Sequence, residues 1–417
     1  MCNQPRCDKP SVELADVFLR YGDAYIEQHR VSTPQDKAIR ALSRCRTAAL
    51  GGHVTRCNHC GIEKNNYNSC RNRHCPKCQT TKQMRWSESR KAELLPVGYF
   101  HVVFTIPHEL NGIASYNQSL VYNLLFKAAW IAVCELGKNS KDFGGLMGML
   151  AFLHTWGQNL SQHIHLHCMI PGGALCDVDG QKQWKSSKPN YIFSVKVMAK
   201  FTGKVFLRLL KEAYKNNEIT FGGSISELEK PAKFNQLIAL LYKKSWNVYA
   251  KEPFNGAEGG LEYLSRYVSK TAIGNERIIS HDNQQVTFKW RDYADESKEK
   301  IMVLDAREFI RRYLQHVLPN GFMRIRAFGF LANACKAKNI DLIRSQLTPH
   351  DKSSKQDKKD KEPIDELMMR LTGIDINLCQ NCKIGHLETI GSLPSQWELT
   401  LIELNKINEQ PQYADTS

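Results

Sequence analysis

Two histidines, His165 and His167, flank a single leucine in the stretch HTWGQNLSQHIHLHCMIPGG. Alternate side chains of a β-strand point to the same face, so both imidazoles, and His163 one step earlier, would lie on one side of a sheet. Imidazole is the commonest metal ligand among side chains. The pair therefore predicts a metal site. Among 14 histidines in 417 residues, chance alone predicts roughly half of one His-x-His pair, so the prediction needs support from other residues.

The residues before this pair favour a hairpin that would complete the site. Met149–Gln158 and 163–170 are expected to form its antiparallel strands. Gln158 would bring an amide oxygen towards the imidazoles, with His154 and Trp156 on the same face. Two imidazoles and an amide leave coordination positions open, which suits Mg²⁺ or Mn²⁺ shared with a phosphate oxygen. Such a metal would act as a Lewis acid.

A pair of tyrosines, Tyr263 and Tyr267, lies in GGLEYLSRYVSKTAIGN. In a short helix over 261–270, this spacing puts both phenols on one face, about 6 Å apart along the axis. Either phenol could attack phosphorus and form a 5′-phosphotyrosyl intermediate while a metal withdraws charge. Arg266 and Lys270 could contact the DNA backbone. Taken alone, the spacing is more typical of helix packing.

Four cysteines form two Cys-x-x-Cys knuckles, Cys57 with Cys60 and Cys75 with Cys78, separated by 14 residues. This is near the spacing of zinc ribbons, so we predict one closed, structural zinc site with these four thiolates. Further candidate ligands for a second zinc occur in the same region: Cys45, His53, Cys70 and His74. A third knuckle, Cys379 with Cys382, needs two more ligands, for which His386 is one candidate, or is only a turn.

Charge favours a polyanionic partner. The chain has 57 Lys and Arg against 42 Asp and Glu, a formal charge of +15, and residues 36–93 alone hold 13 against four. This excess indicates nucleic acid rather than a neutral small molecule, with an anionic membrane as the weaker alternative. The candidate DNA contacts outside the tyrosine segment, to bases or to phosphates, are Arg71, Arg73, Arg85 and Arg324.

Hydropathy argues against a membrane protein. The N-terminus has no apolar core of a secretion signal. The longest apolar run, Leu120–Leu136, is interrupted by polar residues and is too short to span a bilayer, so we expect a buried helix. Reduced cysteines in metal sites then suit a cytoplasmic protein.

The pattern of elements predicts an α+β fold with a mainly antiparallel central sheet flanked by helices. The expected helices cover 12–28, 34–50, 118–137, 195–216, 234–249 and 306–317, and strands are expected at 99–106, near 277 and at 286–292. We expect three parts: 1–95 with helices, the zinc site and DNA contacts; 96–345 with the histidine and tyrosine pairs, which would form a nuclease domain; and 346–417 with a charged linker and a small Cys-x-x-Cys element.

Taken together, these motifs resemble the HUH-type, two-tyrosine transposases of bacterial rolling-circle insertion sequences. The likeness rests on CRTAALGGHVTRCNHC, YNSCRNRHCPKCQ, LLPVGYFHVVFTIPHELN, HTWGQNLSQHIHLHCMIPGGAL, EYLSRYVSKTAIGN and RIRAFGFLANA. It implies a zinc-binding N-terminal domain followed by an HUH nuclease domain, with His165 and His167 as the HUH pair, Gln158 as third ligand and Tyr263 and Tyr267 as nucleophiles.

The resemblance also implies the substrate. Single-stranded DNA at the element ends and at the target would be nicked and rejoined without a nucleotide cofactor, by a protein associated with the bacterial nucleoid. Two alternatives stay open: an HUH replication initiator of a plasmid or phage, and a zinc protein that binds DNA without cleaving it. The sequence does not give the oligomeric state.

Overall fold

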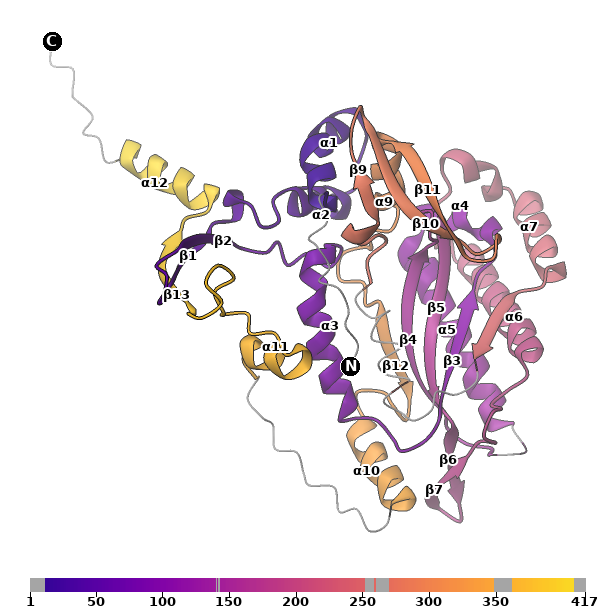
Figure 1. The fold of residues 1–417 in the computed structure, drawn as a ribbon. Coiled ribbons are helices and arrows are strands. Elements are labelled where there is room, and N and C mark those ends of the chain that lie inside the picture. Colours follow the sequence, from indigo (N-terminus) through magenta and orange to yellow (C-terminus); the bar gives the residue numbers. More distant parts are fainter. Residues whose placement is uncertain are drawn as a thin grey trace.

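A computed structural model of the chain describes residues 12–139, 141, 143–251, 259, 270–348 and 362–408. Tyr263, Tyr267 and Arg266 lie outside these residues. Within them, a five-stranded sheet with helices on one face is the largest unit (Figure 1).

The central sheet has the order β12-β4-β5-β3-β8, and all four pairings are antiparallel. Its strands are β3 (Tyr99–Thr105), β4 (Gly148–Trp156), β5 (Gln162–Pro171), β8 (Asn247–Lys251) and β12 (Ile325–Gly329). β4 and β5 are neighbours as the sequence predicts, and in their register His154 lies opposite His165. On the other side of β5, Thr105 lies opposite His165.

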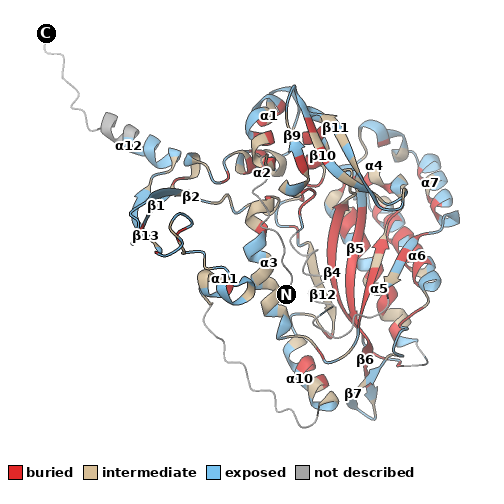
Figure 2. Ribbon diagram, in the orientation of Figure 1, coloured by how far each residue is buried: buried red, intermediate tan, exposed pale blue. Residues whose placement is uncertain are grey.

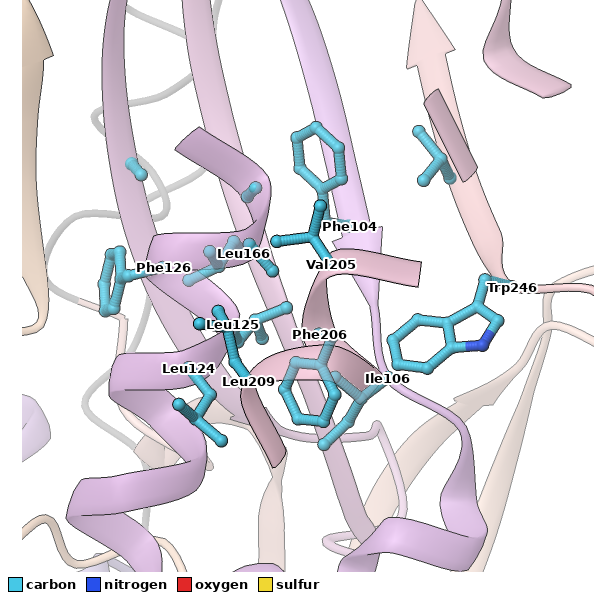
Figure 3. Packing of buried hydrophobic residues seen from close by; sticks show 14 of the residues in the cluster. Phe104, Ile106, Leu124, Leu125, Phe126, Leu166, Val205, Phe206, Leu209 and Trp246 are labelled. Atoms are coloured by element: carbon cyan, nitrogen blue, oxygen red, sulfur yellow. The ribbon is translucent and has the colours of Figure 1, made fainter. Parts of the chain in front are cut away.

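The two central strands are buried along nearly their whole length (Figure 2). One face of the sheet is covered by α5 (Gln118–Lys138) and α6 (Val195–Lys215). Phe104 and Leu166 from the sheet pack there with Leu125 of α5 and Phe206 of α6 (Figure 3). Removing this apolar surface from water stabilises the fold by roughly 25 cal/mol per Å².

Helix α5 contains the long apolar run of the sequence. Among the described residues it is the one helix that is long and apolar enough to cross a membrane. However, 56% of its most apolar 18-residue stretch is buried inside the protein. It packs against α6 and β4 in the main core. The expectation of a buried helix is confirmed.

A second layer stands at one end of the sheet, on the side away from α5. It consists of a three-stranded antiparallel sheet, a helix that follows it, and the two N-terminal helices: β9 (Ile278–Ser280), β10 (Gln285–Asp292), β11 (Lys298–Asp305), α9 (Ala306–Leu314), α1 (Leu14–Gln28) and α2 (Thr33–Ser43). A capping box between Ser32 and Gln35 begins α2. These elements share one apolar cluster, in which Phe18 and Tyr313 meet edge to face.

A third sheet joins the two ends of the chain. Its order is β13-β1-β2, with β1 (Gly52–Cys57), β2 (Glu63–Tyr67) and β13 (Leu387–Leu393). The helix α3 (Pro76–Lys91) follows β2 and begins with a proline, whose missing N–H costs nothing at that position. The segment 346–417 therefore contributes a strand to the N-terminal sheet.

The remaining elements lie at the periphery of these sheets. They are η1 (Ala48–Leu50), η2 (His108–Leu110), α4 (Asn111–Tyr116), β6 (Gly173–Val178), β7 (Gln181–Ser186), η3 (Gly223–Glu229), α7 (Pro231–Lys243), η4 (Asn275–Arg277), α10 (Lys336–Leu347), α11 (Ile364–Thr372) and α12 (Gln396–Asn408).

The α+β class with antiparallel sheets is confirmed. Three expected helices extend three or more residues too far, and the one expected over 306–317 ends at Leu314. The helix expected over 234–249 ends at Lys243, because the β-prone segment from Asn247 pairs with β3 as an edge strand. The helix expected over 34–50 ends at Ser43, and a separate 3₁₀ turn covers Ala48–Leu50.

Candidate functional site

One group of four thiols lies where α2 ends and α3 begins. It consists of Cys45, Cys70, Cys75 and Cys78. The Sγ atoms of Cys45, Cys70 and Cys75 each lie 3.6 Å from a neighbouring Sγ of the group. Four sulfurs at about 2.3 Å from one tetrahedral zinc would be roughly 3.8 Å apart, whereas a disulfide bond is about 2.0 Å long. The donor set therefore fits structural zinc.

A second group joins the chain ends: Cys57, Cys60, Cys379 and Cys382. The Cys57 and Cys382 sulfurs are 3.7 Å apart, and those of Cys60 and Cys379 are 3.8 Å apart. Backbone N–H groups donate to sulfur in both knuckles, from Cys60 to Cys57 and from Gly385 to Cys382. The N–H groups of Gly385 and Ile384 lower the pKa of Cys382 to about 6, which favours the thiolate that zinc requires.

The two knuckles of this second group are built alike. Gly61 and Lys383, the residues directly after each knuckle, both have positive φ, 72° and 56°, and both N–H groups donate to the carbonyl of the first cysteine. Each chain thereby turns back so that two sulfurs face one point. The second knuckle supplies the partner pair that the first one needs.

The grouping corrects the expected zinc site. Cys57 and Cys60 do not share a centre with Cys75 and Cys78, because antiparallel pairing of β13 with β1 brings the C-terminal knuckle to the end of β1. Cys45 and Cys70 complete the other centre. Within the described residues, the candidate ligands that stay outside both groups are His53, exposed on β1; His74, whose Nε2 accepts from the Leu318 N–H; and His386, which pairs with Asp375.

The third group is histidine: His154, His165 and His167, whose ligand nitrogens lie within 4.8 Å of one another. The Nε2 atoms of His165 and His167 are 3.1 Å apart. Two imidazole nitrogens bound to one ion at about 2.1 Å each would be separated by roughly 3.0–3.4 Å. The geometry therefore fits a shared divalent metal.

Hydrogen bonds orient two of these rings. His165 Nδ1 lies 2.8 Å from the carbonyl oxygen of His163, so it carries the proton and leaves the Nε2 lone pair for a ligand. His167 Nδ1 lies 2.9 Å from Nε2 of His101 on β3. Partners of this kind fix the tautomer and orientation of metal-binding histidines.

Burial keeps these rings neutral. It lowers the pKa of His165 to about 3 and that of His101 to about 4, and the pKa of His167 falls far below its usual value for the same reason. Positive charge on neighbouring groups, including Lys270, acts in the same direction on His167. Neutral imidazole is the form that binds a metal.

The histidine group forms the wall of an open cleft of about 1050 Å³. The tip of the β10–β11 hairpin borders the cleft opposite the sheet, with Arg291 and Tyr293. Tyr293 is 69% exposed, and Tyr249 of β8 is 56% exposed on another wall. Cationic and aromatic side chains thus face the same space as the imidazoles.

Gln158 lines this cleft from the loop after β4. Its side-chain amide nitrogen donates to the Tyr293 hydroxyl at 3.2 Å, and its backbone carbonyl oxygen accepts from Arg277. Its role as third ligand stays a prediction. His154 is the residue that the structure groups with the predicted pair as a third imidazole.

The candidate DNA contacts have different surroundings. Lys270 lines the cleft, and Arg71 is exposed at the surface. Arg73 donates to the Phe322 carbonyl at 2.8 Å and Arg324 to the Lys270 carbonyl at 3.4 Å, and burial lowers the pKa of both guanidinium groups. Arg85 donates to the Glu362 carbonyl at 3.4 Å.

Sequence reasoning placed His154 on the correct face without assigning it as a ligand, and it did not find His101. A signal for His154 was available, since the expected hairpin already put it beside the His-x-His strand. His101 had no such signal, because its approach depends on β3 pairing with β5 across 66 residues.

Comparison with known proteins agrees with a zinc-containing transposase. The family described as a putative transposase matches residues 148–338, and the transposase zinc-binding domain of the IS91 type matches residues 17–106. Putative transposase y4qJ of Sinorhizobium fredii is 41% identical over 382 residues, which cover 91% of this chain and 94% of that protein. No solved structure is detectably similar.

A second relative is the transposase for insertion sequence element IS801 of Pseudomonas savastanoi pv. phaseolicola, 27% identical over 71% of this chain and 70% of its own length. The protein is thus a transposase with a zinc-binding domain. It belongs to the IS91 family of insertion-sequence transposases.

Proposed function

We propose that this transposase works by the rolling-circle route, nicking and rejoining single-stranded DNA through a 5′-phosphotyrosine intermediate with Mg²⁺ or Mn²⁺. The nuclease would be an HUH domain within residues 96–345, acting at the bacterial nucleoid. The observation that carries the proposal is the group of three imidazoles, His154, His165 and His167, on the wall of an open cleft.

The chain's own residues would act as follows. The three histidines hold the ion, and His101 keeps His167 turned towards it. A divalent ion bound there supplies positive charge that polarises the scissile phosphate. Lys270 and Arg291, on the cleft wall, contact neighbouring phosphates, and the exposed rings of Tyr249 and Tyr293 stack on unpaired bases.

The covalent step belongs to Tyr267 or Tyr263. The phenol oxygen gives up its proton, attacks phosphorus and forms a phosphotyrosyl bond while the bond from phosphorus to the 3′ oxygen breaks. That oxygen takes up a proton and leaves as a 3′ hydroxyl. A second cleavage and strand exchange, with the 3′ hydroxyl as nucleophile, then joins the element to its target.

The test uses labelled single-stranded oligonucleotides from the flanks of the gene, incubated with the full chain and Mn²⁺ or EDTA and separated on a denaturing gel. We expect a metal-dependent protein–DNA adduct that is lost in Tyr263→Phe/Tyr267→Phe. Tyr191→Phe, which changes an exposed tyrosine outside the cleft, is the matched control. An adduct of undiminished yield in the double variant would refute the nucleophile assignment, and binding without cleavage across many flanks would favour a non-cleaving DNA-binding protein.

A further inference from the structure

A groove runs along the exposed side of α6, on the helical side of the central sheet. Two adjoining hollows of about 650 and 560 Å³ form it, and Lys204 and Tyr242 line both. Trp246 lies on the floor of the first hollow, directly before β8. A Cβ at Gly203 would meet the Trp246 ring at 2.8 Å, so glycine is needed for the indole to lie against α6.

The groove is lined by a row of cations. Lys196, Lys200, Lys204 and Arg208 occupy every fourth position of α6, and all four are exposed. Residues four apart lie on one face of a helix, about 6 Å apart along its axis. Lys243 at the end of α7 adds a further cation to the first hollow.

The row carries little compensating charge. Arg208 pairs with Glu212 at 2.8 Å, but in the described part of the chain no ion pair involves Lys196, Lys200 or Lys204. Like charges four residues apart on a helix repel each other and destabilise it. A polyanion along the row would convert this repulsion into attraction.

The groove meets the histidine cleft at the edge of the sheet. Asn247, the first residue of the edge strand β8, lines both the first hollow and the cleft. Tyr249, two residues further along the same strand, faces the cleft. A chain that leaves the histidines therefore has a route around β8 to α6.

We propose that this groove binds the backbone of single-stranded DNA as the strand leaves the histidine cleft. The inference rests on the proposed function, because it needs DNA in that cleft. Tyr242 is 49% exposed and lies between the two hollows, where its ring can stack on an unpaired base. A duplex hides the faces of its bases, so a single strand is the better partner.

The test compares Lys196→Gln/Lys200→Gln/Lys204→Gln with the wild-type full chain. Fluorescence anisotropy measures binding of oligothymidylates of about 6 and about 20 nucleotides. Three lost phosphate contacts should weaken binding of the long strand about tenfold near physiological salt and reduce the magnitude of its log–log salt slope by about 2. Binding of the short strand, which the cleft alone accommodates, should be unchanged.

The matched control is Lys182→Gln/Lys185→Gln/Lys338→Gln, which removes three exposed lysines outside the groove and changes the net charge equally. A loss equal to that of the groove variant would overturn the proposal, as would an equal loss for the short strand or for a duplex of the same length. Failure of the proposed nuclease function would give a different result. His165→Ala would then cleave DNA as well as the wild type, while binding that depends on the groove persisted.

Discussion

The cysteine centres and the histidine centre of this transposase differ in how many ligands the protein supplies. Each cysteine centre presents four thiols to one point, enough to fill tetrahedral coordination. The histidine group presents three imidazoles on the wall of a cleft of about 1050 Å³, where coordination positions remain for water or substrate. Under the proposed function, this difference separates ions that stabilise the fold from an ion that would contact DNA.

The surroundings differ in the same sense. Backbone N–H groups and turns close the Cys57 and Cys382 knuckles around their sulfurs. The histidines instead stand on a preformed sheet, and His101 and the His163 carbonyl hold the rings in place. Metal binding should therefore contribute to folding at the cysteines and to chemistry at the histidines.

The largest expected effect is at the cysteine centre that joins the chain ends. Cys60→Ser and Cys382→Ser should each reduce bound zinc from two ions to one, and the double variant should lose no more, because both thiols serve the same centre. Structural zinc contributes on the order of 10 kcal/mol, so the N-terminal sheet should lose protection from proteolysis. Cys134→Ser, outside both centres, is the control, with zinc measured by plasma mass spectrometry.

At the histidines we expect the reverse pattern. His167→Ala should reduce metal-dependent DNA cleavage by about a thousandfold or more while the zinc content stays at two. Its melting temperature should stay close to that of the wild type. Cleavage assays and thermal unfolding on the same preparation check the loss of activity and the retained stability. If His167→Ala instead unfolded and lost zinc, the two kinds of centre would not differ in role.

A smaller effect concerns pH. Burial lowers the pKa of His316 to about 4, whereas an unfolded histidine titrates near 6.5. The unfolded chain therefore binds more protons between these values, so stability is complete above about pH 6.5 and decreases as the pH falls towards 4. Between pH 7 and pH 5, the free energy of unfolding measured in urea should fall by about 2 kcal/mol less for His316→Gln than for the wild type.

His316 is suited to this test because it is separate from the metal centres. Its Nδ1 lies 3.2 Å from the Thr155 hydroxyl and its Nε2 lies 3.1 Å from the Leu160 carbonyl, contacts that a glutamine amide can replace. An identical loss of stability in wild type and variant would assign the pH dependence to other groups.

The smallest effect is expected at the hairpin tip. Tyr293→Ala should weaken binding of a short single strand in the cleft about fivefold to tenfold, since stacking on one base contributes roughly 1–3 kcal/mol. Tyr293→Phe, which keeps the ring, should bind nearly as well as the wild type. If both variants lost affinity equally, the hydroxyl that contacts Gln158 would be the important group.

Local patterns predicted local structure well. The expected bounds agree within one or two residues for the hairpin strands β4 and β5 and for the helices α5 and α6. Their apolar periodicity and turn residues lie in the segments themselves. The expected grouping of cysteines failed for the opposite reason. Cys57 and Cys382 are 325 residues apart, and only the pairing of β13 with β1 brings them together.

The site shows the same division. His165 and His167 are recognisable from their spacing, and His154 follows from one predicted hairpin. The β10–β11 tip and His101 enter through contacts between distant elements, which no local pattern encodes. The tyrosine pair lies outside the described residues, so its role rests on sequence alone.

The cysteine centre that joins the two ends of the chain also affects the order in which the protein folds during synthesis. A nascent chain is made from its N-terminus, and its early parts begin to fold first. The centre of Cys45, Cys70, Cys75 and Cys78 can close once the first quarter of the chain has emerged from the ribosome. Cys57 and Cys60 must wait for Cys379 and Cys382, so a transposase made from a message that stops early would lack one complete zinc centre.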